Sequence, residues 1–112
     1  MTDCLFCRIA SGEARADRVH EDEHVVAFRD INPASPTHIL VVPRKHIATL
    51  ADLAPEDDAL VGHLTRIAAQ VAAADGRSDF RVAVNCGAGA GQSVFHLHMH
   101  VLGGRALGWP PG

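Results

Sequence analysis

Residues 55–76 carry the clearest hydrophobic period in the chain, and it is the period of a helix. Apolar side chains recur there at i, i+1, i+4, i+7, i+8 and i+11, which places them on one face. Pro55 suits the first helical position, the acidic residues after it suit the positive N-terminal end of a helix, and Gly76 is placed to end it. The pattern predicts one long helix whose core-facing stripe comprises Leu60, Val61, Leu64, Ile67, Ala68 and Val71.

Shorter apolar runs before this helix predict strands. Residues 37–42 are β-branched and apolar almost throughout, as is typical of a central strand buried on both faces. Residues 19–21 and 24–28 flank a polar pair at 22–23 and indicate a hairpin. Residues 30–36 contain two prolines, which predicts a loop between the hairpin and the central strand.

Two further elements complete the fold prediction. Residues 80–84 alternate as another strand, and Leu5, Phe6 and Ile9 indicate a short N-terminal helix or turn anchored to the core. The chain then holds about five strands, mostly joined by hairpin-type connections, and one main helix. We therefore predict a single domain over residues 1–112 with an α+β fold, an antiparallel sheet with the helix on one face.

The last alternation runs through residues 96–101 and carries the chemistry. His96, His98 and His100 alternate with apolar residues, so a strand here would project all three imidazoles to one side. Such a set could hold a catalytic zinc with an open position, or one imidazole could be a nucleophile tuned by its neighbours. Three glycines between residues 87 and 91 can present backbone N–H groups to phosphate oxygens. This loop favours a phosphate held beside a nucleophilic nitrogen.

Composition and charge narrow the class of protein. The 47% hydrophobic and 21% charged residues fit an ordinary globular domain. A net charge of −3 without a basic run gives no support for a nucleic-acid surface, and no apolar run approaches the roughly 20 residues of a membrane helix. Three cysteines, an odd number, and an N-terminus without signal-peptide features make the cytoplasm the expected location.

Residues 96–102, His-Leu-His-Met-His-Val-Leu, fit a specific signature of histidines alternating with apolar residues. By this motif the chain resembles the histidine triad (HIT) family of nucleotide hydrolases and transferases. The resemblance runs from Cys4 to Gly112, and segments 28–33, 36–46, 91–94 and 103–105 look like other stretches that the family shares. The ending Trp-Pro-Pro-Gly at 109–112 is similar to that of the Hint branch, the purine nucleoside phosphoramidases.

The resemblance implies a HIT-like fold, a homodimer with joined sheets, and hydrolysis of the P–N bond of purine nucleoside phosphoramidates. A neutral imidazole would attack phosphorus, the amine would leave, and water would release the nucleotide from a nucleotidyl-histidine. The motif assigns the nucleophile to His98, which the spacing alone does not single out. It assigns the phosphate and leaving-group region to Asn85, Ser93 and His100, and it requires no metal for catalysis.

The same resemblance assigns the nucleoside-binding residues. Asp30 matches the family's ribose-binding acid, since a carboxylate accepts hydrogen bonds from both ribose hydroxyls. Trp109 matches a C-terminal residue that approaches the other subunit's site in the Hint branch. The expected apolar base pocket comprises Leu5, Phe6, Ile9, Phe28 and Ile31, each of which could equally be plain core, and the phosphate rim comprises Gly91, Gln92, Ser93 and Val94.

Three positions depart from the pattern or stay open. Ala90 stands where relatives often have glycine, so a positive φ there would carry strain. Cys86 replaces a residue that is often acidic, and its thiol would make the site sensitive to oxidation. His38 is either a core histidine bonded to backbone or a residue that supports the triad.

Two rival functions remain. One is the Fhit branch of the family, which cleaves dinucleoside polyphosphates, but its members usually carry threonine in place of Ser93 and proline in place of Gly103. The other is a nucleotide-binding regulator that uses the same pocket without turnover.

Cys4 and Cys7 form a Cys-x-x-Cys pair with the spacing common in zinc sites. The pair needs two further ligands, and histidine is their natural source. Some bacterial HIT proteins resemble this chain in carrying the pair with histidines at the positions of His46 and His96, where they hold a structural zinc. The alternative is a pair of reduced core thiols.

Overall fold

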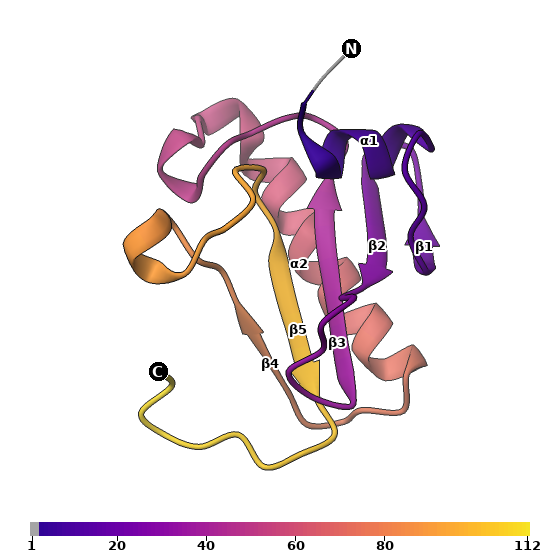
Figure 1. The fold of residues 1–112 in the computed structure, drawn as a ribbon, viewed down its shortest axis with the longest axis vertical. Coiled ribbons are helices and arrows are strands. Elements are labelled where there is room, and N and C mark those ends of the chain that lie inside the picture. Colours follow the sequence, from indigo (N-terminus) through magenta and orange to yellow (C-terminus); the bar gives the residue numbers. More distant parts are fainter. Residues whose placement is uncertain (1–2) are drawn as a thin grey trace.

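The computed structural model describes residues 3–112, and its centre is a five-stranded antiparallel sheet in the order β1-β2-β3-β5-β4 (Figure 1). This confirms the predicted α+β class, with one main helix and a short N-terminal helix. The helices and strands are α1 (Leu5–Ser11), β1 (Arg18–Glu21), β2 (Val25–Arg29), β3 (Thr37–Pro43), α2 (Asp58–Ala74), β4 (Phe80–Ala83) and β5 (Met99–Gly103). Three 3-10 turns join them, at Leu50–Asp52, Pro55–Asp57 and Ala88–Ala90.

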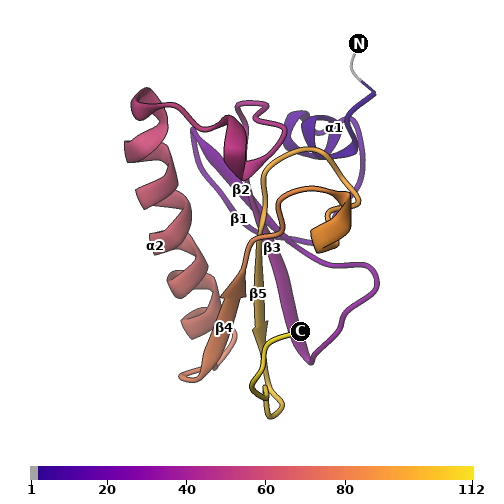
Figure 2. The ribbon, with the colours of Figure 1, turned by 90° about the vertical axis from the view of Figure 1, so that its left-hand side faces the viewer.

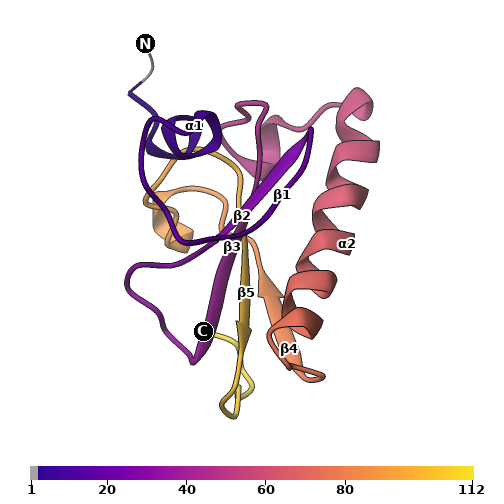
Figure 3. The same cartoon turned by 90° about the vertical axis from the view of Figure 1, so that its right-hand side faces the viewer.

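Helix α2 covers one face of the sheet, as Figures 2 and 3 show from opposite sides. Its predicted stripe is confirmed, since Leu64, Ile67, Ala68 and Val71 are buried against the sheet while Leu60 and Val61 pack at its margin. Strand β3 is buried at every position, because the helix lies on one side of it and α1 on the other. The apolar residues that alternate with the histidines, Leu97, Met99 and Val101, point into this α2-side core.

The opposite face carries α1, the glycine-containing loop and the loop between β2 and β3 (Figures 2 and 3). A second, smaller apolar cluster lies beneath α1, built from Phe6, Ile9, Phe28, Leu40 and neighbouring residues. The side chains at alternate positions of β5 face this side of the sheet. The polar side chains of the histidine-bearing strand therefore lie on the face of the sheet that α2 does not cover.

Two predicted boundaries were wrong in detail. The long helix begins at Asp58 rather than Pro55, because Pro55–Asp57 forms a separate 3-10 turn. The triad strand begins at Met99 rather than His96. Its ladder with β3 ends at the pair Val41–Met99, and Pro43, two residues further along β3, has no N–H to donate.

Among residues 3–112, α2 is the one long helix, and the structure contains no helix long and apolar enough to cross a bilayer.

Candidate active site

His98 lies where the chain enters β5, and it is 6% exposed. Its Nδ1–H donates to the backbone carbonyl of His96 at 2.7 Å. A carbonyl oxygen only accepts hydrogen bonds, so the proton of the neutral ring sits on Nδ1 and the lone pair on Nε2. The His100 ring packs beside it with centroids 4.9 Å apart. Nε2 of His98 is therefore the ring nitrogen with a lone pair to offer an electrophile.

His38 and Asp30 extend this pair into a chain of polar groups. His38 Nε2 lies 2.9 Å from Nδ1 of His100 and 3.3 Å from Oδ2 of Asp30, while His38 Nδ1 accepts the backbone N–H of Ala34 at 2.9 Å. Because Nδ1 accepts, the His38 proton sits on Nε2 and is donated to His100. His100 then keeps its own proton on Nε2. His38 thus bonds backbone and also supports the triad, so both roles left open by the sequence are realised.

Burial keeps these two histidines uncharged. It lowers the pKa of His100 to about 4, and the neighbouring His98 and His38 add to this effect against the smaller opposing pull of Asp30. Burial also lowers the pKa of His38, again opposed by Asp30. At neutral pH both rings are hydrogen-bond donors through a neutral N–H.

The ligand atoms of Asp30, His38 and His100 lie within 4.8 Å of one another, as a metal site would require. A metal on His38 Nε2 would displace the proton that the Ala34 N–H confines to that nitrogen. The three triad imidazoles do not converge either, because His96 turns its Nδ1 toward the cysteines. The donor set and its protons therefore favour proton positioning over a catalytic metal here.

The glycine-containing loop folds around a buried glutamine. Gly87 and Gly91 have φ of 92° and 97°, a conformation that L side chains rarely adopt. Among residues 3–112 only glycines have positive φ, so Ala90 carries none of the strain considered above. The Gln92 amide accepts the N–H of Gly87 and donates to the carbonyls of Ala48 and Val94. Gln92 therefore braces the loop from inside, and its buried amide is engaged with the backbone rather than available as a donor at the predicted phosphate rim.

Asn85 and Ser93 lie at the two ends of this loop. Asn85 is half-buried, and its Nδ2 would lie 3.5 Å from a side chain placed on Gly91. Ser93 is exposed immediately after the buried Gln92. Asn85 therefore lies next to Gly91, Ser93 follows two residues later in the chain, and Cys86 is exposed.

The expected base pocket is only partly assembled in the single chain. Phe6, Ile9 and Phe28 are buried together under α1, with Val94 packed against them. Leu5 is 43% exposed at the edge of this cluster. Ile31 is 91% exposed, so the structure does not bring it into the apolar cluster, because it lies on the solvent side of the loop after β2.

The Cys-x-x-Cys pair lies against two histidines, as the sequence comparison implied. Cys4 Sγ is 3.3 Å and Cys7 Sγ 3.5 Å from Nδ1 of His96, and Cys7 Sγ is 3.3 Å from Nδ1 of His46. The two imidazole Nδ1 atoms are 3.2 Å apart. Ligands of a tetrahedral zinc with these donor types would be about 3.3–3.8 Å apart. We call these four residues the Cys/His cluster.

The protons of His96 also fit a metal ligand. Its Nε2–H donates to the carbonyl of Pro43 at 2.7 Å, which leaves the Nδ1 lone pair directed at the two cysteines. Metal-binding histidines usually donate their second ring nitrogen in this way. His96 is fully buried and burial lowers its pKa, which keeps the lone pair available.

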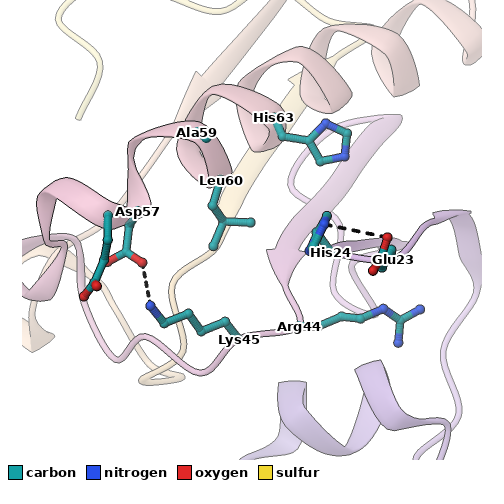
Figure 4. A pocket seen from close by; sticks show the side chains of 9 residues that line it. Glu23, His24, Arg44, Lys45, Asp57, Ala59, Leu60 and His63 are labelled. Carbon is teal, nitrogen blue, oxygen red and sulfur yellow. Dashed lines mark hydrogen bonds and ion pairs between the residues drawn. The ribbon is translucent and has the colours of Figure 1, made fainter.

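A separate hollow of about 340 Å³ lies on the α2 side of the sheet (Figure 4). Two pairs of its polar groups lie against each other: Lys45 Nζ bonds Asp57 at 2.6 Å, and His24 lies near Glu23. Leu60 and Ala59 form its apolar wall. None of the residues that line it belongs to the triad or the Cys/His cluster, so we assign it no part in the chemistry.

Comparison with known proteins decides the family. A family model described as the HIT domain matches residues 11–107. The chain belongs to the HIT family. A HIT-like protein of Synechocystis is 49% identical over 111 residues, which cover 98% of this chain and 97% of that protein. Protein HitA of Neisseria gonorrhoeae is 45% identical over 92% of this chain and 97% of its own length.

Solved structures agree with this HIT assignment. A HIT family hydrolase from Legionella pneumophila superposes with a TM-score of 0.96 at 47% identity, covering 98% of this chain and 100% of that one. A histidine triad protein from Clostridium difficile gives a TM-score of 0.92 at 44% identity and 96% coverage of both chains.

Sequence reasoning missed three kinds of contact in this HIT site. The Pro43 and His96 carbonyls orient imidazoles, but backbone groups leave no trace in a residue pattern. Phe6 is predicted only as a wall of the base pocket, and the sequence does not predict its contact with the His98 ring. The pairing of His38 with His100 follows from the adjacent strands β3 and β5, a contact that the order of strands in the chain does not reveal.

Proposed function

We propose that this HIT protein hydrolyses the P–N bond of purine nucleoside phosphoramidates through a covalent nucleotidyl-His98. His98 Nε2 forms the N–P bond as the P–N bond of the substrate breaks, and the amine leaves with a proton. Water then breaks the N–P bond to His98 and releases the nucleoside monophosphate. The single displacement of the amine by water is thereby divided into two easier displacements at phosphorus.

The observation that carries this proposal is the hydrogen bond from His98 Nδ1–H to the His96 carbonyl. It holds the ring in one tautomer, with the nucleophilic lone pair on Nε2, without requiring a charged partner. Nucleophilic catalysis needs such an oriented, neutral imidazole.

The neighbouring groups support the charge that develops on phosphorus. His100 Nε2–H is a neutral donor, because His38 occupies the other nitrogen. Asn85 and Ser93 flank the glycine loop and supply further donors, and Ser93 would pass a proton to the departing amine. Donors fixed before the reaction stabilise phosphoryl transfer states more than mobile ones do.

Asp30 and the cluster beneath α1 suit a nucleoside. Asp30 Oδ1 accepts the Asn32 N–H, which fixes the carboxylate near the triad for the ribose hydroxyls. Phe6, Ile9 and Phe28 offer an apolar wall to a purine base, and we assign Leu5 to the rim of that pocket.

The Fhit-type alternative is favoured by the shared triad but opposed by the local sequence. Ser93, the glycines at 103–104 and the Trp-Pro-Pro-Gly end all resemble the Hint branch. A substrate panel separates the two, because an adenosine phosphoramidate would be preferred over a dinucleoside polyphosphate. A tight nucleotide complex without turnover of either would support the non-catalytic regulator.

The test of the nucleophile uses His98→Ala. We expect turnover to be abolished while nucleotide affinity is largely kept, and wild-type protein quenched in acid-free denaturant should carry a nucleotidyl mass on His98. Residual activity within about tenfold of wild type, under about 1.4 kcal/mol of barrier, would contradict the assignment.

We also propose that the Cys/His cluster holds a structural zinc. When bound, the metal would crosslink the N-terminal segment to the loop before β5 and take no part in the reaction. Protein purified without chelator should contain close to one zinc per chain, and the Cys4→Ser, Cys7→Ser double variant should contain none. Metal-free protein whose melting temperature does not change on adding zinc would refute the site. Brief chelation that leaves this structural metal bound should leave the wild-type rate nearly unchanged, because no catalytic metal is expected.

We propose, finally, that the active form is a homodimer in the cytoplasm. Edge strand β4 exposes Phe80 and Val82, each 38% accessible, and an unpaired strand edge is a template for a second copy. Trp109 is 82% exposed near the C-terminus and is assigned to the partner's site. A thiol-rich cluster is also better preserved in a reducing compartment.

A further inference from the structure

Phe6 touches the proposed nucleophile directly. Its ring meets the His98 imidazole edge-on, with centroids 5.0 Å apart and planes at 87°. The same ring makes edge contacts with Phe28 at 5.4 Å and with His96 at 6.0 Å. Phe6 is 5% exposed, so it is enclosed by these rings and has little freedom to turn away.

Two further contacts position the buried His98 ring. The Nδ1–H bond to the His96 carbonyl fixes one edge, and His100 packs at one side. A hydrogen bond at one ring nitrogen restricts rotation of the imidazole but still allows the ring to tilt about that bond. The contact with Phe6 prevents this tilt and so fixes the direction of the Nε2 lone pair. A displacement of about 1 Å in such a group can cost up to about 100-fold in rate.

Phe6 in turn depends on the Cys/His cluster for its position. It lies between Cys4 and Cys7 in sequence, on α1, a helix of seven residues. A helix this short is not stable by itself. Cys4 caps it, accepting the N–H of Cys7, and both thiols lie against His46 and His96. The cluster therefore places the first turn of α1, which carries Phe6.

We infer that Phe6 is a positioning residue through which the Cys/His cluster fixes the reactive direction of His98. The inference rests on the proposed function for the step that it affects, but the contact itself is independent of the substrate. Its consequence is that the state of the cluster regulates kcat from a site that touches no reacting atom.

The first experiment compares Phe6→Leu with Val26→Ala in the metal-loaded protein. Val26 lies in the same apolar cluster and is fully buried, but it belongs to neither the catalytic nor the binding set. We expect Phe6→Leu to lower kcat about tenfold or more, and Val26→Ala to change it less than about twofold at a comparable loss of stability. Equal effects on kcat, or an effect of Phe6→Leu on KM alone, would overturn the inference.

Nuclear magnetic resonance of the His98 ring provides a readout without substrate. The ¹⁵N shifts of wild type should report one tautomer, with the proton on Nδ1, and Phe6→Leu should add a second population or exchange broadening. In the Cys4→Ser, Cys7→Ser double variant Phe6 is still present, so a changed ring-current shift of the His98 ring protons would report its displacement. Unchanged ring shifts in that double variant would refute the coupling.

A double-mutant cycle then tests whether the cluster acts through Phe6. Removing both thiols should lower kcat in the wild-type background and have little further effect in the Phe6→Leu background, because the shared route is already lost. If the losses of kcat from the thiol substitutions and from Phe6→Leu are additive, the Cys/His cluster and Phe6 act on His98 separately. If the double thiol variant does not fold, Cys4→Ser alone enters the cycle.

These outcomes separate the inference from the proposed function. A protein that cleaves no phosphoramidate but shows the ring-shift changes would refute the function and keep the contact. If the protein hydrolyses phosphoramidates but the ¹⁵N and ring-proton shifts of His98 are unaltered in the variants, the proposed function stands and the positioning role of Phe6 is refuted.

Discussion

At the scale of single residues, backbone groups decide which nitrogen of each histidine carries the proton. The Pro43 carbonyl holds the proton of His96 on Nε2, and the His96 carbonyl holds that of His98 on Nδ1. The Ala34 N–H has the opposite effect and leaves a lone pair on Nδ1 of His38. Three chemically identical side chains therefore differ in what they present: His96 directs a lone pair at the cysteines, His98 keeps a lone pair on Nε2, and His38 donates its proton to His100.

The hydrogen-bonded pair of buried His38 and half-buried His100 predicts a loss of stability in acid. An unfolded histidine has a pKa near 6.5, whereas burial lowers the folded pKa of His100 to about 4. Between these values the unfolded chain binds a proton that the folded chain does not, so the free energy of unfolding decreases as pH falls from 6.5 to 4. The contribution of His100 is about 2–3 kcal/mol.

Urea unfolding of wild type and His100→Asn at pH 7, 5.5 and 4.5 measures this contribution. The asparagine carbonyl can still accept the His38 proton but does not titrate, so the variant should lose less stability on acidification. Parallel losses in the two proteins would show that His100 is not responsible.

At the scale of elements, the periodic sequence patterns predicted which helices and strands form, but they did not predict where each element begins or ends. The α2 stripe and the fully buried β3 followed from period and composition. The start of β5 did not, because it depends on where the ladder with the neighbouring strand β3 ends. The Cys/His cluster was implied only through resemblance, since His46 and His96 are 50 residues apart and spacing does not bring them together. The exposure of Ile31 and the inward turn of Gln92 depend on loop geometry, which has no period.

One carboxylate ties the end of α2 to the sheet. Asp75, which follows α2, pairs with Arg29 of β2 at 2.7 Å and accepts the hydroxyl of Thr37 at the start of β3. The Arg29 and Thr37 hydrogen bonds lower the pKa of Asp75 to about 2. The stabilisation is therefore complete above the ordinary pKa of 3.8 and is lost as pH falls to about 2.

We expect Asp75→Asn to lower the free energy of unfolding at pH 7 by about 1–3 kcal/mol, because Arg29 and Thr37 lose a charged acceptor. Asp79→Asn, an exposed carboxylate four residues further on, is the matched control and should cost less than about 0.5 kcal/mol. Denaturant unfolding measures both. The difference between wild type and Asp75→Asn should shrink as pH falls from 4 to 2, and a constant difference would exclude the ion pair as its cause.

At the scale of the whole molecule, the two edges of the sheet are not equivalent. Strand β1 forms one edge and β4 the other, and each exposes a valine: Val19 is 37% and Val82 38% accessible. Of these two edge strands it is β4 that lies next to β5, the strand that carries His100. Strand β4 also binds the C-terminal segment, since Arg81 donates to the carbonyls of Leu107 and Gly108. A second copy joined at β4 would therefore bring two sites and two C-terminal segments together.

This asymmetry predicts different outcomes for the same substitution at the two edges. Lysine on an edge strand opposes pairing with another chain, so Val82→Lys should convert a dimer of twice the 11.9 kDa chain mass into a monomer, whereas Val19→Lys should leave the dimer intact. Light scattering coupled to size-exclusion chromatography measures the mass. Because Trp109 is assigned to the partner's site, the Val82→Lys monomer should also show a raised KM. A wild-type protein that is monomeric at the concentrations of the assay, or a dimer broken by Val19→Lys instead, would place the interface elsewhere.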